Sequence, residues 1–185
     1  IMAFVLLVLT SNTGSFSTLF ASGVYGLSLC ILYFCSAKYH HTQDPVKKLF
    51  FRKLDHISIY VLIAGTYTPY TLVFLSHSKG VLLFGIVWSV ALLGTFLKIF
   101  FTGRFEIISL LLYLVMGWLI VFDFTALELA VSPRAISLLV AGGGFYTAGI
   151  LFYVWNSLKY NHVLWHLFVL AGSICHFFSI YLELI

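Results

Sequence analysis

The sequence has little charge: only 9% of its 185 residues are Asp, Glu, Lys or Arg, and 62% are hydrophobic. A soluble domain of this size cannot bury so much apolar surface, because its interior is limited. The mean hydropathy of +1.07 therefore indicates a membrane protein. The few basic residues are scattered between apolar runs, so the net charge of +4 gives no support for a nucleic-acid partner.

Cysteine is scarce as well, and two patterns are missing. Cys30, Cys35 and Cys175 lie in apolar runs without CxxC spacing, and we interpret them as packing or lipid-facing residues. No run alternates with a period of two, which argues against a membrane β-barrel. No basic segment with a small-residue cleavage site marks a signal peptide. A helical bundle remains, because each backbone polar group in lipid must be bonded within the protein.

Long apolar runs are present, and each can cross the roughly 30 Å of hydrocarbon in a bilayer. They occupy residues 16–39, 57–75, 81–101, 107–124, 135–155 and 163–185. A shorter run at residues 1–9 has about half of the ~20 residues that a span needs, and we interpret it as a truncated first helix. We therefore predict an all-α, polytopic integral membrane protein with seven transmembrane helices in a single domain, residues 1–185.

The basic residues predict the orientation. The connectors after the second, fourth and sixth runs carry Lys38, Lys47, Lys48, Arg52, Lys53, Lys98, Arg104 and Lys159. The opposite connectors carry only Lys79 and Arg134. Because basic residues concentrate on the cytoplasmic side, we predict a cytoplasmic N-terminus, most simply in a bacterial inner membrane.

This topology brings polar residues of three helices to one depth near the cytoplasmic face. They are Ser36 and His40, Asp55 and His56, and His162 and His166. Polar side chains in membrane helices usually face the bundle interior and carry function, although these lie close to the boundary.

The spacing of His162 and His166 favours a metal site. Residues at i and i+4 lie about 40° apart around a helix, so both imidazoles can reach one point. Two such histidines and a third from another helix, here His40, are a common ligand set for Zn²⁺ that leaves one position for water. Asp55 would then orient or deprotonate that water. The alternative is that the two histidines are interfacial residues near the head groups.

The other histidines have simpler interpretations. We expect His41 and His77 in loops or at the interface, and His56 either next to the metal site or in a wet cytoplasmic position. His176 lies ten residues beyond His166, about 15 Å along a helix. We expect it to bond a neighbouring helix.

Four further features have structural interpretations. Asp123 and Glu183 are expected to be solvated boundary charges. Pro69 is expected to kink its helix, with Thr66 and Thr68 satisfying the freed carbonyls. The glycines at 142–144 are expected to allow close helix packing.

Four segments resemble the hemolysin III branch of the progestin and adipoQ receptor (PAQR) family. They are "SAKYHH" (36–41), "RKLDHISIYVLIAGTYTPYTL" (52–72), "LYLVMGW" (112–118) and "YNHVLWHLFVLAGSICHFF" (160–178). The resemblance covers nearly the whole chain in the same order. Two departures are Lys38, at a position that is usually apolar or small, and the family's leading helix with its preceding histidine segment, which we expect to be missing here.

The resemblance implies seven helices, a cytoplasmic N-terminus and a zinc ion near the cytoplasmic face. It implies His40, His162 and His166 as ligands. It matches Ser36 to the serine of the family's Ser-x-x-x-His motif and Asp55 to the aspartate that faces the zinc-bound water.

These features predict a zinc-dependent hydrolase of a membrane lipid amide or ester, since receptor relatives are linked to ceramide hydrolysis. One alternative is a pore-forming cytolysin, as the branch name asserts. Another is a receptor or regulator of membrane lipid state in which the zinc is structural. The partners that we expect are membrane lipids.

Overall fold

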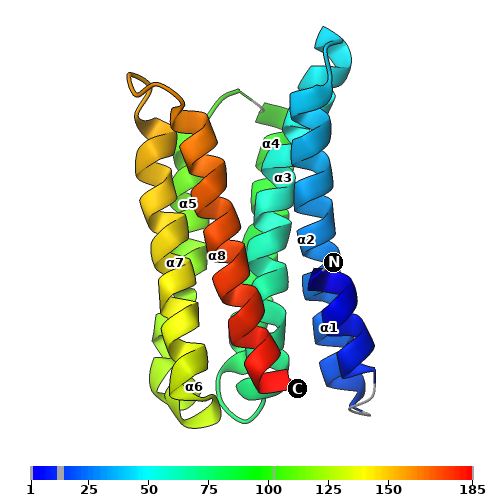
Figure 1. Cartoon of the computed structure of the whole chain (residues 1–185), viewed down its shortest axis with the longest axis vertical. Coiled ribbons are helices and arrows are strands. Elements are labelled where there is room, and N and C mark those ends of the chain that lie inside the picture. The colour runs from blue at the N-terminus through cyan, green and yellow to red at the C-terminus, as the bar shows by residue number, and fades with distance from the viewer. Residues whose placement is uncertain (1, 12–14, 102, 185) are drawn as a thin grey trace. The chain divides into compact units, whose positions relative to one another are not determined.

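The structure, a computed structural model, describes residues 2–11, 15–101 and 103–184, and these form helices joined by short connectors (Figure 1). These residues contain no strand, so the all-α prediction is confirmed. The chain comprises two compact units, Ile1–Asp123 and Phe124–Ile185. A single domain over residues 1–185 stays a prediction.

Six helical segments are long and apolar enough to cross a membrane. They are Phe16–His41, Pro45–Phe74, Gly80–Phe101, Glu106–Ala130, Pro133–Val154 and Asn161–Leu184. The expected truncated helix is α1, Met2–Thr10, which has nine residues and is too short to span. The outermost residues of the predicted runs, Ile1 and Ile185, lie outside the described residues. The predicted multi-pass membrane protein is confirmed, and its orientation stays a prediction.

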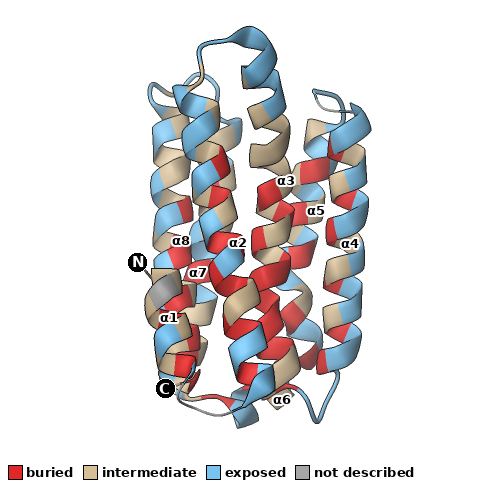
Figure 2. Cartoon of the chain, turned by 90° about the vertical axis from the view of Figure 1, so that its right-hand side faces the viewer, coloured by how far each residue is buried: buried red, intermediate tan, exposed pale blue. Residues whose placement is uncertain are grey.

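The first unit is built on two adjacent helices, α2 and α3. Its elements are α1, α2 (Phe16–His41), α3 (Pro45–Pro69), the π-helix η1 (Tyr70–Phe74), α4 (Gly80–Phe101), α5 (Glu106–Trp118) and the 3₁₀-helix η2 (Leu119–Asp123). Buried residues cluster along the facing sides of α2 and α3 (Figure 2). Gly65 on α3 permits this packing, because a Cβ there would lie 2.3 Å from the Ser28 Oγ of α2.

Helix α3 begins twelve residues before the apolar run at 57 that predicted it. Asp44 is its N-cap, and the Asp44 Oδ1 accepts the Lys47 N–H at 2.9 Å. Pro45 occupies the first helical position, where a missing N–H does no harm. The helix therefore starts at a polar cap, which an apolar pattern cannot locate.

At Pro69, where a kink is predicted, the helix changes its hydrogen-bond pattern. The chain passes from α-helix into the π-helix η1, in which the Leu75 N–H bonds the Tyr70 carbonyl at 2.8 Å. Thr66 and Thr68 bond the carbonyls four residues before them, at 2.8 and 2.9 Å. Neither hydroxyl bonds the carbonyl of residue 65, which is the one that Pro69 leaves free, so this part of the prediction is wrong.

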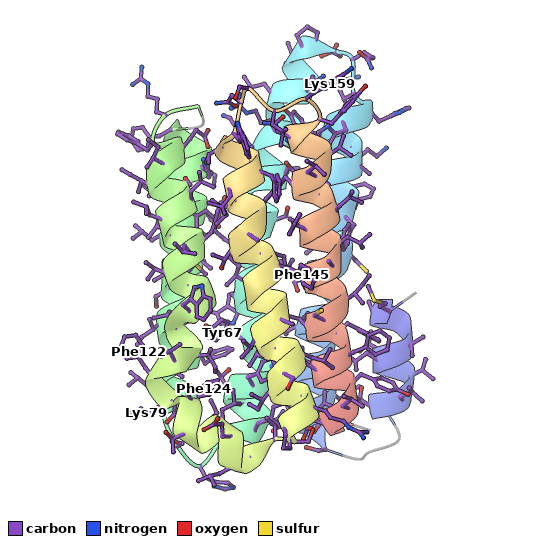
Figure 3. The ribbon with its side chains drawn as sticks, turned by 60° about the vertical axis from the view of Figure 1, so that its left-hand side comes forward. Tyr67, Lys79, Phe122, Phe124, Phe145 and Lys159 are labelled. Atoms are coloured by element: carbon purple, nitrogen blue, oxygen red, sulfur yellow. The ribbon has the colours of Figure 1, made fainter. Side chains whose placement is uncertain are left out.

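Asp123 is not a solvated boundary charge, and that prediction is also wrong. Its side chain is buried, accepting the Ser78 hydroxyl at 3.0 Å and the Lys79 N–H at 2.9 Å. The Lys79 ammonium donates to the Phe122 carbonyl at 3.2 Å (Figure 3). These contacts fasten the connector before α4 to the end of η2.

The second unit contains α6 (Phe124–Ala130), α7 (Pro133–Val154) and α8 (Asn161–Leu184), with α7 and α8 side by side (Figure 1). Glu183 accepts the Ser132 N–H at 3.0 Å, so it fastens the start of α7, contrary to the expectation of a merely solvated charge. The Ser132 hydroxyl in turn caps α7 by accepting the Ala135 N–H at 3.3 Å.

Only one of the three adjacent glycines of α7 packs closely. A Cβ on Gly142 would lie 2.1 Å from the His176 ring of α8, whereas nothing lies within 4 Å of a Cβ on Gly143 or Gly144. His176 bonds the Leu139 carbonyl at 3.2 Å, which confirms its predicted bond to a neighbouring helix.

Candidate metal centre

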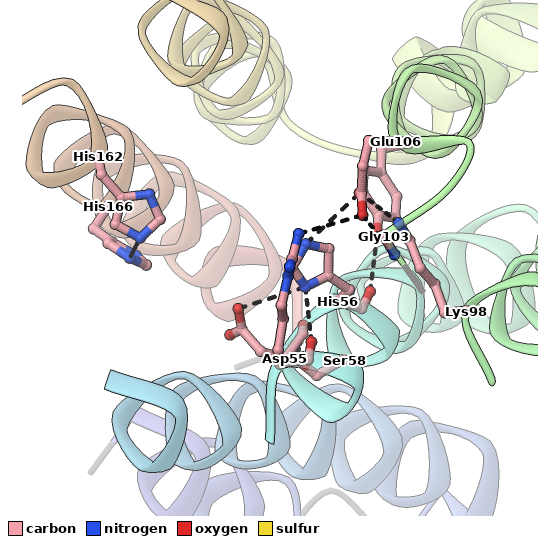
Figure 4. Close-up of polar contacts among 10 residues, drawn as sticks. Asp55, His56, Ser58, Lys98, Gly103, Glu106, His162 and His166 are labelled. Carbon is pink, nitrogen blue, oxygen red and sulfur yellow. Dashed lines mark hydrogen bonds and ion pairs between the residues drawn. The ribbon is translucent and has the colours of Figure 1, made fainter. Parts of the chain in front are cut away.

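The two histidines at the start of α8 lie against each other. The Nε2 atoms of His162 and His166 are 3.0 Å apart, and their rings meet at 89° (Figure 4). Zinc bonds imidazole nitrogen at about 2.0–2.1 Å in a tetrahedron, which separates two ligand nitrogens by about 3.3 Å. The pair therefore fits two corners of a zinc site with a small adjustment.

The connector before α8 determines where this pair lies. Tyr160 is left-handed, with a φ of 63°, and its carbonyl accepts the Leu164 N–H at 3.0 Å as α8 begins. His162 consequently falls in the first turn of α8 and His166 in the second. The Tyr153 ring of α7 lies 6.4 Å from the His162 ring and 5.4 Å from the Trp165 ring. Aromatic packing thus supports the His162 side of α8.

The remaining predicted site residues belong to the first unit. Ser36 and His40 lie in the last two turns of α2, and His40 is exposed. Asp55 lies in the third turn of α3, with its side chain 14% exposed. The Lys38 ammonium lies 5.6 Å from the centroid of the Phe34 ring, so its stem runs back along α2. The roles of Ser36, His40 and Asp55 stay predictions.

The Glu106 carboxylate of α5, which the sequence did not single out, contacts polar side chains of α3 and α4. Glu106 Oε2 accepts the Lys98 ammonium at 2.6 Å, and Glu106 Oε1 accepts the Gly103 N–H at 3.2 Å (Figure 4). Arg52 Nη2 lies 3.7 Å from Oε1 and His56 Nε2 lies 3.8 Å from Oε2. We call Arg52, His56, Lys98 and Glu106 the Glu106 cluster.

One sequence signal could have indicated this cluster. Lys98 is in the last turn of α4 and Glu106 in the first turn of α5, where each charge complements its helix dipole. The charge pattern assigns Lys98 to a basic connector, but its side chain is 1% exposed.

Of the other histidines, His56 is largely shielded from solvent, whereas His41 and His77 are exposed. His56 does not occupy a wet position, because its side chain is 13% exposed, and its Nδ1 lies 2.8 Å from the Arg52 carbonyl and 4.0 Å from Asp55 Oδ2. His77 is exposed in the turn before α4, as predicted. His41 is exposed at the end of α2, and its position at the membrane interface stays a prediction.

Comparison with known proteins identifies the family. The profile of the haemolysin-III related family matches residues 1–177. The chain is 42% identical over 176 residues to Hemolysin-3 of Bacillus cereus, across 95% of this chain and 80% of that protein. It is 41% identical over 175 residues to the Hemolysin-3 homolog of Bacillus subtilis (strain 168), across 95% and 82%.

A more distant relative is the human monocyte to macrophage differentiation factor, 25% identical over 169 residues, which are 85% of this chain and 68% of that protein. No solved structure was found to match the chain. The profile match confirms the resemblance seen in the four sequence segments. The chain belongs to the haemolysin-III related family, within the wider PAQR family, and is a multi-pass integral membrane protein.

Proposed function

We propose that this protein holds a zinc ion and hydrolyses an amide or ester bond of a membrane lipid. The observation that carries the proposal is the pair of imidazole Nε2 atoms, 3.0 Å apart on one face of α8. Imidazole is a preferred ligand of Zn²⁺. His40 is the third ligand in this proposal, since the distribution of basic residues assigns the end of α2 and the start of α8 to the same side of the membrane.

The chain's own residues divide the chemistry as follows. A zinc ion bound by His40, His162 and His166 supplies Lewis acidity toward a carbonyl group. The Asp55 carboxylate accepts the proton of the attacking water, acting as a general base. The Ser36 hydroxyl, one turn before His40, forms a hydrogen bond that stabilises the proposed zinc site. Within α3, the Ser58 hydroxyl donates to the Asp55 carbonyl at 2.6 Å and anchors that turn.

A lipid substrate suits the surface of the helices. Exposed apolar side chains run along α4 at Leu82, Leu92, Phe96 and Phe100. Side chains of this kind facing outward are those expected in contact with acyl chains. In this proposal, a lipid amide or ester reaches the polar residues from within the bilayer, without crossing water.

The first test is the metal content of the purified chain. We expect about one zinc ion per chain by inductively coupled plasma mass spectrometry. The His162→Ala/His166→Ala variant should lose the metal, because two of the three proposed ligands are gone. His41→Ala is the matched control: it removes an exposed histidine next to His40 and should keep the metal. A metal-free wild type overturns the proposal.

The second test is turnover of labelled ceramides by the reconstituted protein. We expect release of fatty acid that stops on chelation and returns with added zinc. Asp55→Asn should keep the metal and lower kcat by about 100-fold or more, as expected for loss of a general base. If Asp55→Asn is as active as the wild type, the mechanism is wrong. Bound zinc without turnover, with a thermal stability that falls on chelation, would instead indicate a structural metal.

The names of two relatives, Hemolysin-3 and Hemolysin-3 homolog, supply a second candidate function. In that case the chain would permeabilise membranes, and its activity would need no hydrolysis. This candidate predicts that the protein releases dye from loaded vesicles. Whether dye passes depends on how the polar groups are distributed over the whole molecule.

A further inference from the structure

The continuous helix formed by α3 and η1 is longer than a membrane span requires. It covers Pro45–Phe74, 30 residues, or about 45 Å at 1.5 Å per residue. The hydrocarbon core of a bilayer is about 30 Å thick, and the whole bilayer with its head groups is about 40–45 Å thick. One end of this helix must therefore lie at the depth of the head groups.

The charges identify that end. Residues 45–53, which we call the α3 entry segment, carry Lys47, Lys48, Arg52 and Lys53, whereas the opposite end, η1, is uncharged. The entry segment also has an exposed apolar stripe. Val46, Leu49 and Phe50 are 80%, 52% and 56% exposed. Their spacing of three and four residues puts them on one face of the helix.

Three cations of the entry segment have no acidic partner. Asp44 caps the helix, and Glu106 is held by Lys98 and Arg52. Over the part of the chain that the structure describes, Lys47, Lys48 and Lys53 form no ion pair with a carboxylate. Lys48 lies 6.0 Å from the centroid of the Tyr39 ring, and Lys53 donates to the Ile99 carbonyl at 3.5 Å. The segment is therefore apolar on one stripe and has an excess of positive charge beside it.

We infer that the α3 entry segment binds anionic phospholipid head groups of the leaflet in which it lies. An exposed apolar stripe beside unpaired lysines matches the boundary between acyl chains and negatively charged head groups. The bilayer is favoured over a soluble partner because the segment that carries the stripe continues directly into the membrane-spanning part of the same helix. This binding is independent of zinc and of hydrolysis.

A reporter placed in the stripe tests the inference on the full chain. Phe50→Trp adds an indole beside the lysines, and its signal is taken relative to the parent protein with its four native tryptophans. The protein is reconstituted in bilayers that contain phosphatidylcholine or phosphatidylglycerol with brominated acyl chains, which quench a neighbouring indole. Leu49→Trp serves as a second reporter in case the first variant folds poorly.

We expect the reporter to be quenched about fivefold more readily by phosphatidylglycerol than by phosphatidylcholine, since one basic residue near an anionic surface contributes about that factor. Adding Lys47→Gln/Lys48→Gln should lower the ratio, with Lys53 retained, and salt at about 1 M should bring it close to one. The matched control Lys79→Gln/Arg134→Gln removes two cations, one before α4 and one in the first turn of α7, and should leave the ratio unchanged.

Two outcomes overturn the inference. The first is a ratio that survives the loss of Lys47 and Lys48, or that falls equally in the control. The second is a reporter that neither brominated lipid quenches, which would mean that a second copy of the chain or another protein covers the stripe.

Discussion

Lys98 is the most deeply buried charge in the described part of the chain, and Glu106 is its partner at 2.6 Å. A cation in an apolar interior is tolerated only if it is paired, because desolvation costs several kcal/mol. The carboxylate of Glu106 also accepts the Gly103 N–H, so one residue serves both a buried charge and a connector. Loss of the Glu106 carboxylate should therefore lower the free energy of unfolding more than loss of an ordinary surface charge.

We predict that Glu106→Gln lowers the free energy of unfolding by about 3 kcal/mol. This is the lower end of the range for breaking a buried pair, because the Glu106 side chain is 30% exposed. The measurement is denaturant unfolding in detergent micelles. The control is Glu128→Gln, which removes an exposed carboxylate and should change the value by less than about 0.5 kcal/mol.

A double variant checks the cause. Lys98→Met/Glu106→Leu removes both charges and should be more stable than Glu106→Gln alone, because no buried unpaired charge remains; Arg52, which also loses Glu106, is 39% exposed. If Glu106→Gln behaves like Glu128→Gln, the ion pair contributes nothing to stability.

At the scale of elements, the contact between α7 and α8 depends on Gly142. The His176 ring occupies the space of the missing side chain and is held there by the Leu139 carbonyl at 3.2 Å. We predict that Gly142→Ala destabilises the protein by about 1 to 3 kcal/mol, the usual cost of overpacking. The measurement is again unfolding in micelles.

Gly143→Ala is the matched control, since it adds the same methyl group one residue away with no atom within 4 Å. It should be neutral or slightly stabilising, because alanine favours helix more than glycine does. Equal effects of the two substitutions would contradict the role of the His176 contact.

The long apolar runs predicted the helices well, but not where α3 starts. Its first turns are charged, and their helical state follows from the cap at Asp44 and the proline at position 45. The contacts of Asp123 and Glu183 could not be predicted, since both join segments that are distant in the sequence. A single sequence gives no indication of which connector meets which helix end.

The candidate site likewise has one part that the sequence predicts and one that it does not. The His162–His166 pair could be predicted because both members are on one helix, where spacing fixes direction. The helix-end positions of Lys98 and Glu106 indicate only part of the Glu106 cluster, because its members come from three helices and Lys98 looks like a boundary charge until its burial is known. Spacing within an element is readable from sequence, whereas topology predicts only the membrane depth that elements share and not which of their side chains meet.

At the scale of the whole molecule, most small polar groups of the interior are already bonded. The hydroxyls of Ser28, Ser58, Thr66, Thr68 and Thr71 are buried, and each donates to a carbonyl three or four residues earlier in its own helix. Hydroxyls bonded in this way donate to the backbone of their own helix, so they contribute little to the lining of a water-filled pore. The ionised groups, in turn, gather near helix ends.

We therefore predict that the purified protein does not release dye from liposomes at a low protein-to-lipid ratio. An aqueous pore needs a polar lining through the full hydrocarbon thickness, and the helices instead present apolar side chains such as Leu92, Leu93 and Phe96 outward. The measurement is release of a self-quenched fluorophore, with melittin as the positive control and the His162→Ala/His166→Ala variant alongside. Release by the wild type that the variant also shows would favour the cytolytic candidate, because pore formation would then be independent of the metal. Release that only the wild type shows would instead point to membrane damage by lipid hydrolysis, which product analysis of the same vesicles would detect.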